Sequence, residues 1–308
     1  MRHMITRRSF LTLGAATVGS GLIGATNAFA MEPRYRLAVT GWDVAHPSWP
    51  ASAAPLRIGV MTDIHAVEPW MPAHRIGDIA ARLAAMKPDM IVLLGDYVNA
   101  LRPRFVSRPV PVREWVAALG ELSAPLGVHA VLGNHDWISG EASAIRRAFE
   151  KAGIDVLENR AVRLSHRNTP FWLAGVADQM VSPTNGIRDL EAALDAVTGD
   201  DPLILLTHEP DIFRVTPKRV ALTLAGHTHG GQVYIPFVGR PGLPAQYSGK
   251  NADLAYGHIK QGGRHMVVSS GLGLSGLPVR FLVPPEIVMV TLRGLGTSGL
   301  NLPLTSEA

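Results

Sequence analysis

Five short blocks of this sequence carry aspartate, asparagine and histidine, residue types whose side chains bind divalent metal ions. The blocks are Asp63-Ile64-His65, Gly95-Asp96, Gly133-Asn134-His135-Asp136, Thr207-His208 and Gly226-His227-Thr228-His229. Oxygen and imidazole nitrogen donors suit Mn, Fe, Co or Zn. Two such ions about 3.5–4 Å apart can hold both the attacking and the leaving oxygen of a phosphoryl transfer. The residue types therefore predict a two-metal hydrolytic centre.

Each block follows a short apolar segment that has the character of a buried β-strand. These segments are residues 56–62, 90–94, 128–132, 203–206 and 221–225. Continuous apolar runs are typical of strands that are buried on both faces. Because α/β sheets gather their sites outside the carboxyl ends of such strands, we expect the five blocks to converge.

The segments between the blocks alternate as in an α/β fold. Helices are predicted at residues 73–86, 113–121, 141–152 and 189–197, where they would cover the faces of the sheet. Residues 255–260 and 265–270 flank Gly262-Gly263 and predict a β-hairpin, and residues 287–292 predict a final strand.

In their order along the chain, the five blocks resemble the motifs of calcineurin-like metallophosphoesterases. The resemblance implies a four-layer αββα sandwich, in which two mixed sheets are flanked by helices. It also implies that one metal ion is bound by Asp63, His65 and His229. A second ion would be bound by Asn134, His208 and His227, and Asp96 would bridge the two.

The same resemblance assigns roles to the two residues that follow Asn134. His135 matches the family's non-ligand histidine, which is proposed to protonate the leaving oxygen or to stabilise the charged transition state. Asp136 would orient His135. Turn formation alone requires neither histidines nor this density of ligands, so a purely structural interpretation of all five blocks is disfavoured.

The charges of the predicted ligands favour an anionic substrate. Asp63 and Asp96 are the only anionic ligands, so two divalent ions would leave about two positive charges before hydroxide binds. A water that bridges both ions would have its pKa lowered toward neutrality and could attack phosphorus in line. We expect Mn²⁺, and Fe, Zn or Co remain open because the same ligands accept them.

Two relatives in the superfamily are disfavoured by residues that are missing here. Ser/Thr protein phosphatases continue with Asp-Arg-Gly where this chain has Asn99-Ala100-Leu101. Purple acid phosphatases place a tyrosine ligand three residues after the bridging aspartate, and Asn99 stands at that position.

Residues near the C-terminus resemble an exported bacterial phosphodiesterase branch of the family. The matching segments are residues 226–232, 271–273, 277–280 and 285–287. They are also similar to enzymes that cleave UDP-2,3-diacylglucosamine, so lipid-linked or cell-wall phosphodiesters are the expected substrates. Arg280 could contact a substrate phosphate or form a structural ion pair. Trp70 could contact a lipid or sugar, with possible peripheral membrane contact, or pack over the sheet edge.

The N-terminus indicates export. Thr6-Arg7-Arg8-Ser9-Phe10-Leu11-Thr12 resembles the twin-arginine motif, and a moderately apolar stretch runs on to about Ala25. Ala28-Phe29-Ala30 offers a cleavage site after Ala30, although a retained membrane anchor is the alternative. We therefore expect the twin-arginine translocase as a partner during export, and a periplasmic, extracellular or cell-wall location.

Composition sets the remaining limits. The chain contains no cysteine, which rules out disulfides, and its net charge of +4 over 308 residues is modest. Because no dense basic stripe with interleaved aromatic residues is present, nucleic-acid binding is not expected. We divide the chain into a signal peptide (1–30), a lead-in segment (31–55), one metallophosphoesterase domain (56–293) and a flexible tail (294–308).

These observations predict an exported phosphodiesterase that depends on two metal ions. The alternatives are a phosphomonoesterase with the same site, and a protein that binds the envelope or stores metal without turnover. Retention of His135 and Asp136 counts against the last alternative, because neither residue is needed merely to hold metal.

Overall fold

The computed structural model describes Gly24 and residues 26–98, 100–101, 107–180, 186–244 and 249–296. Most of the predicted signal peptide and residues 297–308 of the predicted tail lie outside the described residues, as does Asn99. Among the described residues, no helix combines the length and the apolar character that a membrane span requires.

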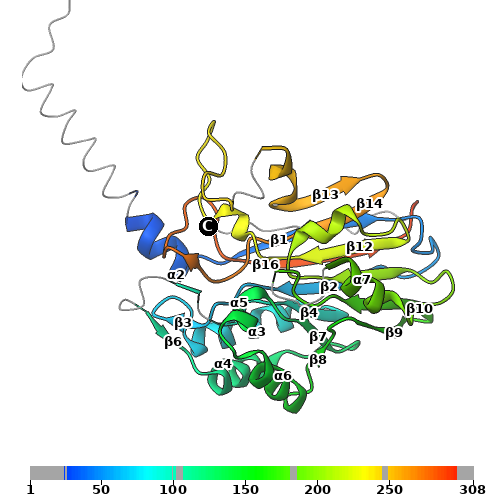
Figure 1. Cartoon of the computed structure of the whole chain (residues 1–308), viewed down its shortest axis with the longest axis horizontal. Helices are drawn as coiled ribbons and strands as arrows, with labels where there is room; N and C mark the ends of the chain where they lie inside the picture. The colour runs from blue at the N-terminus through cyan, green and yellow to red at the C-terminus, as the bar shows by residue number, and fades with distance from the viewer. Residues whose placement is uncertain are drawn as a thin grey trace, which may run out of the picture.

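The first of two six-stranded sheets contains the strands that precede the first three ligand blocks (Figure 1). Its order is β1 (Ala38–Ala45), β16 (Glu286–Arg293), β2 (Leu56–Met61), β4 (Met90–Leu94), β7 (Val128–Val131) and β8 (Asp155–Val156). β2, β4, β7 and β8 are parallel, and β16 runs antiparallel to β2. The carboxyl ends of β2, β4 and β7 therefore lie at one edge.

The second sheet contains the strands that precede the last two blocks. Its order is β13 (Gly257–Gln261), β14 (Arg264–Val268), β12 (Val220–Ala225), β11 (Leu203–Leu206), β10 (Thr169–Gly175) and β9 (Arg160–His166). The four central strands are parallel and the two outer strands are antiparallel to their neighbours. Two short ribbons pair β3 (Val67–Glu68) with β6 (Arg108–Pro109), and β5 (Ala100–Leu101) with β15 (Ser275–Gly276).

Helices cover the outer faces of the sheets. The first sheet carries α3 (Ala73–Ala85), α4 (Val112–Ala118) and α6 (Ala142–Lys151), and the second carries α7 (Gly186–Leu194). In α3 the buried residues are Ile76, Ile79, Ala80 and Leu83, the spacing that places one apolar stripe against a sheet. Shorter helices are η1 (Asn27–Met31), α2 (Glu32–Tyr35), η3 (Leu119–Glu121), α5 (Asn134–Ile138), η4 (Pro210–Arg214), η5 (His229–Gly231) and η7 (Gly249–Leu254).

A continuous apolar core lies between the two sheets. Ile58 and Val60 of the first sheet belong to the same buried cluster as Leu206 and Leu224 of the second. This cluster accounts for the runs that are apolar at every position, because each central strand is covered on both faces. The predicted four-layer αββα arrangement is confirmed.

The first sheet includes residues that precede residue 56, the predicted start of the domain. β1 lies in the stretch predicted as a lead-in segment, and it pairs in parallel with β16 from Ala38↔Glu286 to Ala45↔Arg293. Residues 27–35 form η1 and α2, where the carbonyl oxygen of Ala28 accepts a hydrogen bond from the backbone N–H of Arg280. The folded unit thus begins well before the first metal-binding block.

A cluster of three histidines lies at the β13–β14 hairpin. His258 Nε2 is 2.9 Å from His265 Nδ1, and the rings of His46 and His265 meet edge to face at 5.6 Å. Burial lowers the pKa of His265 to about 4, and the nearby His258, His46 and Lys260 act in the same direction. Burial also lowers the pKa values of His46 and His258.

This cluster should make stability depend on pH. The folded-state pKa of His265 lies below its ordinary value of 6.5, so the unfolded chain takes up the proton first as the pH falls. We expect the free energy of unfolding to decrease from about pH 6.5 toward about pH 4, and His265→Gln to flatten that decrease. Urea denaturation across this range measures it, with exposed His74→Gln as the control. Equal slopes in all three proteins would contradict the prediction.

Candidate metal centre

All seven predicted ligands lie just beyond the carboxyl ends of central strands. Asp63 and His65 follow β2, Asp96 follows β4, and Asn134 begins α5 after β7. His208 follows β11, and both His227 and His229 follow β12. The two sheets are packed so that these ends meet, and the structure brings the side chains together as the sequence predicts.

Five of these ligands have backbone conformations that side chains seldom adopt. Asp63, His65, Asp96, His227 and His229 have positive φ angles of 52°, 43°, 55°, 70° and 51°. Each such residue costs on the order of 1–3 kcal/mol and persists only where its surroundings fix it. Backbone hydrogen bonds supply that constraint, since Asp63 N donates to the Gly95 carbonyl and His65 N to the Asp96 carbonyl, both at 2.9 Å.

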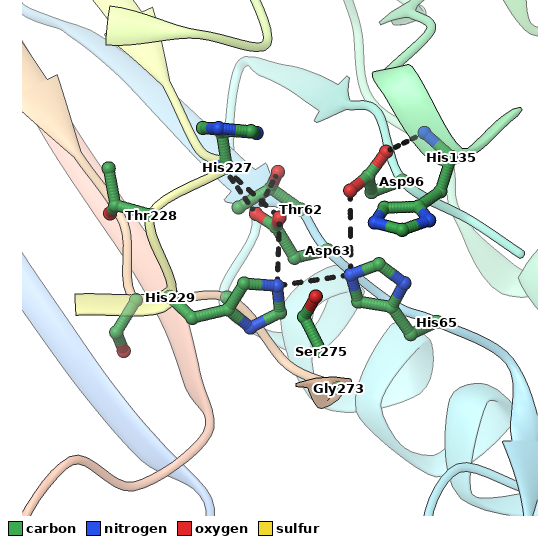
Figure 2. Close-up of polar contacts among 12 residues, drawn as sticks. Thr62, Asp63, His65, Asp96, His135, His227, Thr228, His229, Gly273 and Ser275 are labelled. Carbon is green, nitrogen blue, oxygen red and sulfur yellow. Dashed lines mark hydrogen bonds and ion pairs between the residues drawn. The ribbon is translucent and has the colours of Figure 1, made fainter. Parts of the chain in front are cut away.

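The first group of ligand atoms comes from Asp63, His65 and His229, whose ligand atoms all lie within 4.8 Å of one another. His229 Nε2 is 3.3 Å from Asp63 Oδ1 and 3.0 Å from His65 Nε2. Figure 2 shows these three side chains pointing toward a common point. The group is the one predicted for the first metal ion.

The second group contains Asp96, His208 and His227, again within 4.8 Å. His208 Nε2 lies 3.3 Å from Asp96 Oδ2, and Asn134 Oδ1 lies 3.1 Å from His227 Nδ1. Asp96 Oδ2 is also 3.5 Å from His65 Nε2 in the first group. Asp96 therefore lies between the two groups, where a bridging ligand is needed.

Backbone carbonyl groups orient two of the imidazoles for metal binding. His65 Nδ1 is 2.8 Å from the Val98 carbonyl oxygen, and His208 Nδ1 is 2.7 Å from the Leu94 carbonyl oxygen. Because a carbonyl oxygen only accepts, each Nδ1 carries a proton, which leaves Nε2 as the nitrogen that would bind metal. Both Nε2 atoms face the other ligands, so the donor set fits a pair of divalent cations.

Burial keeps three of the histidines in the neutral form that binds metal. It lowers the pKa of His65 to about 4, that of His227 to about 3, and that of His229 well below its usual range. Burial also raises the pKa of Asp63 to about 6.

Burial alone would raise the pKa of Asp96. The nearby histidines, above all His208, nevertheless hold that pKa well below its usual value. Burial acts downward on the pKa of His208 as well, but Asp96 raises it well above its usual value. At neutral pH the neutral nitrogen donors are therefore His65, His227 and His229.

His135 lies beside both groups without belonging to either. Its backbone N–H donates to Asp96 Oδ1 at 2.9 Å, and its ring meets that of His65 edge to face at 5.3 Å. The side chain is half-buried and lines a cavity of 140 Å³ together with Asp96, His227 and His229. Figure 2 shows the ring next to Asp96. This position suits proton donation to a substrate in the cavity.

The Asp136 carboxylate, which was expected to orient His135, accepts hydrogen bonds from backbone N–H groups. The Oδ2 atom of Asp136 accepts from the backbone N–H groups of Asp96 and Gly133, both at 2.9 Å. Its Oδ1 atom accepts from Tyr97 N at 2.8 Å and from Val98 N at 3.3 Å. Burial raises the pKa of Asp136 to about 7, although the hydrogen bonds from the backbone N–H groups of Gly133 and Tyr97 act to lower it. Asp136 fixes the two loops that carry Asp96 and Asn134.

Arg280 and Trp70 both have structural positions. Arg280 is fully buried, and its guanidinium donates to carbonyl oxygens that include those of Ser270 and Gly273. One of its nitrogens lies 3.4 Å from His229 Nδ1. Trp70 is 9% exposed and clusters with Val67 and Leu274. These carbonyl contacts and this apolar packing are structural roles, and substrate contact by Arg280 or Trp70 stays a prediction.

Two polar residues that sequence reasoning missed support the site. Thr62 Oγ1 donates to Asp63 Oδ2 at 2.7 Å, and Gln232 lines the cavity. The Gln232 amide bonds both the backbone N–H and the carbonyl oxygen of Ser275. Each residue is adjacent or nearly adjacent to a ligand block, but a lone Thr or Gln in such a place is too common to indicate a role.

Gly133 provides a sharp test of the packing around the ligands. A Cβ atom at this position would meet Asp96 Oδ1, lie 2.6 Å from Asp96 N and lie 2.8 Å from the His208 ring. Its φ of −107° is open to any residue, so only space requires glycine. We expect Gly133→Ala to lower metal content and activity by about 10-fold or more, because a misplacement of about 1 Å can cost roughly 10²-fold.

Gly120→Ala is the matched control, because its Cβ would have no neighbour within 4 Å. Metal content by elemental analysis and turnover are measured for both variants. Normal metal binding by Gly133→Ala would show that the ligand loops tolerate more movement than the contacts imply.

Comparisons with known proteins agree with this geometry. The sequence profile described as "Calcineurin-like phosphoesterase" matches residues 56–231. An "Uncharacterized metallophosphoesterase" of Aquifex aeolicus is 33% identical over 245 residues, which are 78% of this chain and 86% of that protein. "Phosphodiesterase YaeI" of Escherichia coli is 32% identical over 302 residues, which are 94% and 100% of the two chains.

A solved structure, TT1561 of Thermus thermophilus, is 14% identical with a TM-score of 0.42, covering 71% of this chain and 91% of that one. The profile spans more than half of the chain and contains all five metal-binding blocks. The chain therefore belongs to the calcineurin-like phosphoesterase family and is a metal-dependent phosphoric ester hydrolase.

Proposed function

We propose that this protein is an exported phosphodiesterase that uses two divalent metal ions to cleave a phosphodiester of the cell envelope. The observation that carries the proposal is the position of His135, a half-buried imidazole at the cavity beside, but outside, two complete ligand groups. A site that merely stores metal has no use for such a residue.

The two ligand groups support a pair of metal sites. Asp63, His65 and His229 would hold one ion, and His208, His227 and Asn134 the other, with Asp96 shared. When bound, such ions polarise the phosphoryl oxygens and lower the pKa of the water that attacks phosphorus. We propose Mn²⁺, and Fe, Zn and Co fit the same nitrogen and oxygen donors.

The protein's own residues would position and protonate the substrate. The backbone bond from His135 N to Asp96 Oδ1 fixes the helix that carries the imidazole relative to the shared ligand. From the cavity wall, His135 can donate a proton to the departing alkoxide oxygen, the step that limits cleavage of a poor leaving group. The buried ligands keep bulk water away from the rest of the site.

The diester and envelope assignments have separate support. A relative of full length, 32% identical, carries the name "Phosphodiesterase YaeI". The twin-arginine-like sequence at Arg7-Arg8 supports export, since that pathway carries folded proteins, which would allow the metals to be loaded first. An exported enzyme meets envelope lipids and cell-wall polymers as its phosphodiesters.

Metal restoration tests this function. Metal-stripped protein is assayed with bis(p-nitrophenyl) phosphate and with p-nitrophenyl phosphate while Mn, Fe, Zn, Co or Mg is restored singly. Faster turnover of the diester is the expected result. Faster turnover of the monoester would make the protein a phosphomonoesterase, and no turnover despite two bound ions would favour a binding protein.

His135→Ala separates catalysis from metal binding. We expect two bound ions and a lower kcat, by about 10²–10⁴-fold if His135 is the general acid. Metal content and kcat are measured on the same preparation. The loss should shrink with p-nitrophenolate leaving groups, which need little protonation, and grow with alkyl leaving groups. An equal loss for both would remove proton donation from the role of His135.

A further inference from the structure

Exposed apolar side chains are concentrated around the mouth of the metal site. Of the thirteen large apolar residues exposed in the described part of the chain, nine lie on three short segments, residues 27–36, 232–240 and 275–284. We call these three segments the rim. Soluble proteins usually scatter such residues singly, so a concentration of this kind indicates a surface that contacts another apolar phase.

Backbone hydrogen bonds join the three segments into one surface. The N–H of Arg280 donates to the Ala28 carbonyl, and the N–H of Phe281 donates to the Gln232 carbonyl, both at 2.9 Å. The Val283 N–H donates to the buried carboxylate of Glu32 at 2.8 Å. Exposed Phe29, Tyr35 and Leu277 are therefore held on a fixed frame.

The hairpin at residues 235–239 presents the most exposed apolar side chains. Ile235 and Gly239 exchange two backbone hydrogen bonds of 2.8 Å, so the turn between them is closed. At its tip Phe237 is 107% exposed and Val238 is 71% exposed. Phe237 has a φ of 68°, a costly conformation for a residue that gains no packing inside the chain. Figure 1 shows this yellow segment projecting from the body of the molecule.

The rim and the metal site share residues. Gln232 and Ser275 line the cavity and belong to the rim, and the Gln232 side chain also donates to the Leu277 carbonyl at 3.2 Å. The cavity measures 140 Å³, whereas pockets that enclose a whole organic ligand measure about 300–1,000 Å³. It can take little more than the phosphodiester group, so the remainder of a substrate must lie over the apolar rim.

The charges of the rim residues indicate which kind of surface the rim contacts. Glu32 is the only acidic residue on the rim and is fully buried, whereas Arg36 is exposed and Arg34 and Arg240 are half-buried, so the accessible charge of the rim is cationic. The predicted leader precedes this part of the rim in the sequence, since η1 begins at Asn27. An apolar surface flanked by cationic residues is typical of proteins that bind anionic lipid surfaces.

We propose that the rim docks on an anionic lipid bilayer and presents the metal site to phosphodiesters held in that surface. The inference rests on the proposed phosphodiesterase function and specifies where its substrate lies. Phe237, Val238, Leu277 and Leu282 enter the interface, and the arginines contact lipid phosphates.

Vesicle flotation tests the proposal with the full chain, so that the leader is the same in every protein. Vesicles of phosphatidylcholine with phosphatidylglycerol are titrated until half of the unaltered protein floats. Phe237→Ser/Val238→Ser should then require about 10-fold or more lipid, because two apolar side chains no longer leave water. Leu277→Ser/Leu282→Ser, on a different segment, should behave alike. Pure phosphatidylcholine should bind the unaltered protein more weakly.

Val215→Ser/Leu295→Ser is the matched control, since these residues are also apolar and, at 47% and 53%, about as exposed as Leu277 and Leu282, but they lie outside the rim. Turnover of soluble bis(p-nitrophenyl) phosphate should be unchanged in all variants, whereas turnover of a vesicle-borne phosphodiester should fall with binding. Failure on the soluble diester would instead refute the phosphodiesterase assignment.

Equal flotation of the rim variants and the control overturns the docking proposal. The proposal is also overturned if the unaltered protein is a dimer and a rim variant is a monomer that still floats normally. The rim would then be an interface between two copies of the chain.

Discussion

Asp96→Ala should abolish activity and empty both metal sites. Asp96 Oδ2 lies 3.3 Å from His208 Nε2 and 3.5 Å from His65 Nε2, so one carboxylate serves both ligand groups. Its removal also leaves two divalent cations with Asp63 as the only anionic ligand. Because the ions contribute several kcal/mol to transition-state stabilisation, we expect turnover to fall by at least about 10³-fold.

Elemental analysis after dialysis, together with turnover, measures the effect of Asp96→Ala. The matched control is Asp43→Ala, which removes an exposed carboxylate paired with Arg293. Two ions per chain in Asp96→Ala would show that the groups bind independently, and Asp96 would then lose its bridging role. Loss of one ion with retention of the other would assign Asp96 to a single group.

Asp136→Asn should damage the site through the fold. The four backbone N–H groups around the Asp136 carboxylate require two acceptor oxygens, but an asparagine amide offers one. Either orientation leaves two buried donors facing an NH₂ group. At about 1–3 kcal/mol for each unsatisfied donor, we expect the free energy of unfolding to fall by roughly 3 kcal/mol. Metal affinity should fall with it.

Urea denaturation above the Asp136 pKa of about 7, combined with metal titration, measures this effect. His135→Ala is the comparison, because it removes the neighbouring side chain and leaves all four backbone bonds in place. A stable Asp136→Asn protein that binds metal but turns over slowly would restore the role of orienting His135.

The convergence of the ligand blocks and the fold class could be predicted, because each depends on a dense local signal. Five ligand blocks after five apolar runs define both the strands and the edge where they end. β1 was missed because Thr40, Gly41 and Asp43 interrupt its apolar pattern, and its place is set by pairing with β16, which begins more than 240 residues later. Long-range pairing of this kind leaves little trace in the local sequence.

The roles of individual residues were harder to predict than their presence. Asp136 is adjacent to His135, which favours contact between them, yet its carboxylate points back to loops that only the folded chain brings close. Arg280 is flanked in the sequence by half-buried Val279 and Phe281 but is itself fully buried. In both cases the role depends on hydrogen bonds to backbone groups that lie close only in the folded chain. Every residue has such backbone groups, so the sequence does not reveal which of them will be the partners.

Each ligand group draws residues from both sheets. Asp63 and His65 follow β2 of the first sheet, whereas His229 follows β12 of the second. The other group joins Asp96 to His208 and His227 in the same manner. A bound ion would therefore act as a cross-link between the halves of the sandwich, and binding to the native state alone raises stability with metal concentration. Chelation would then lower the stability of the folded protein as well as stop the reaction, so the stability of the protein would depend on the metal supply.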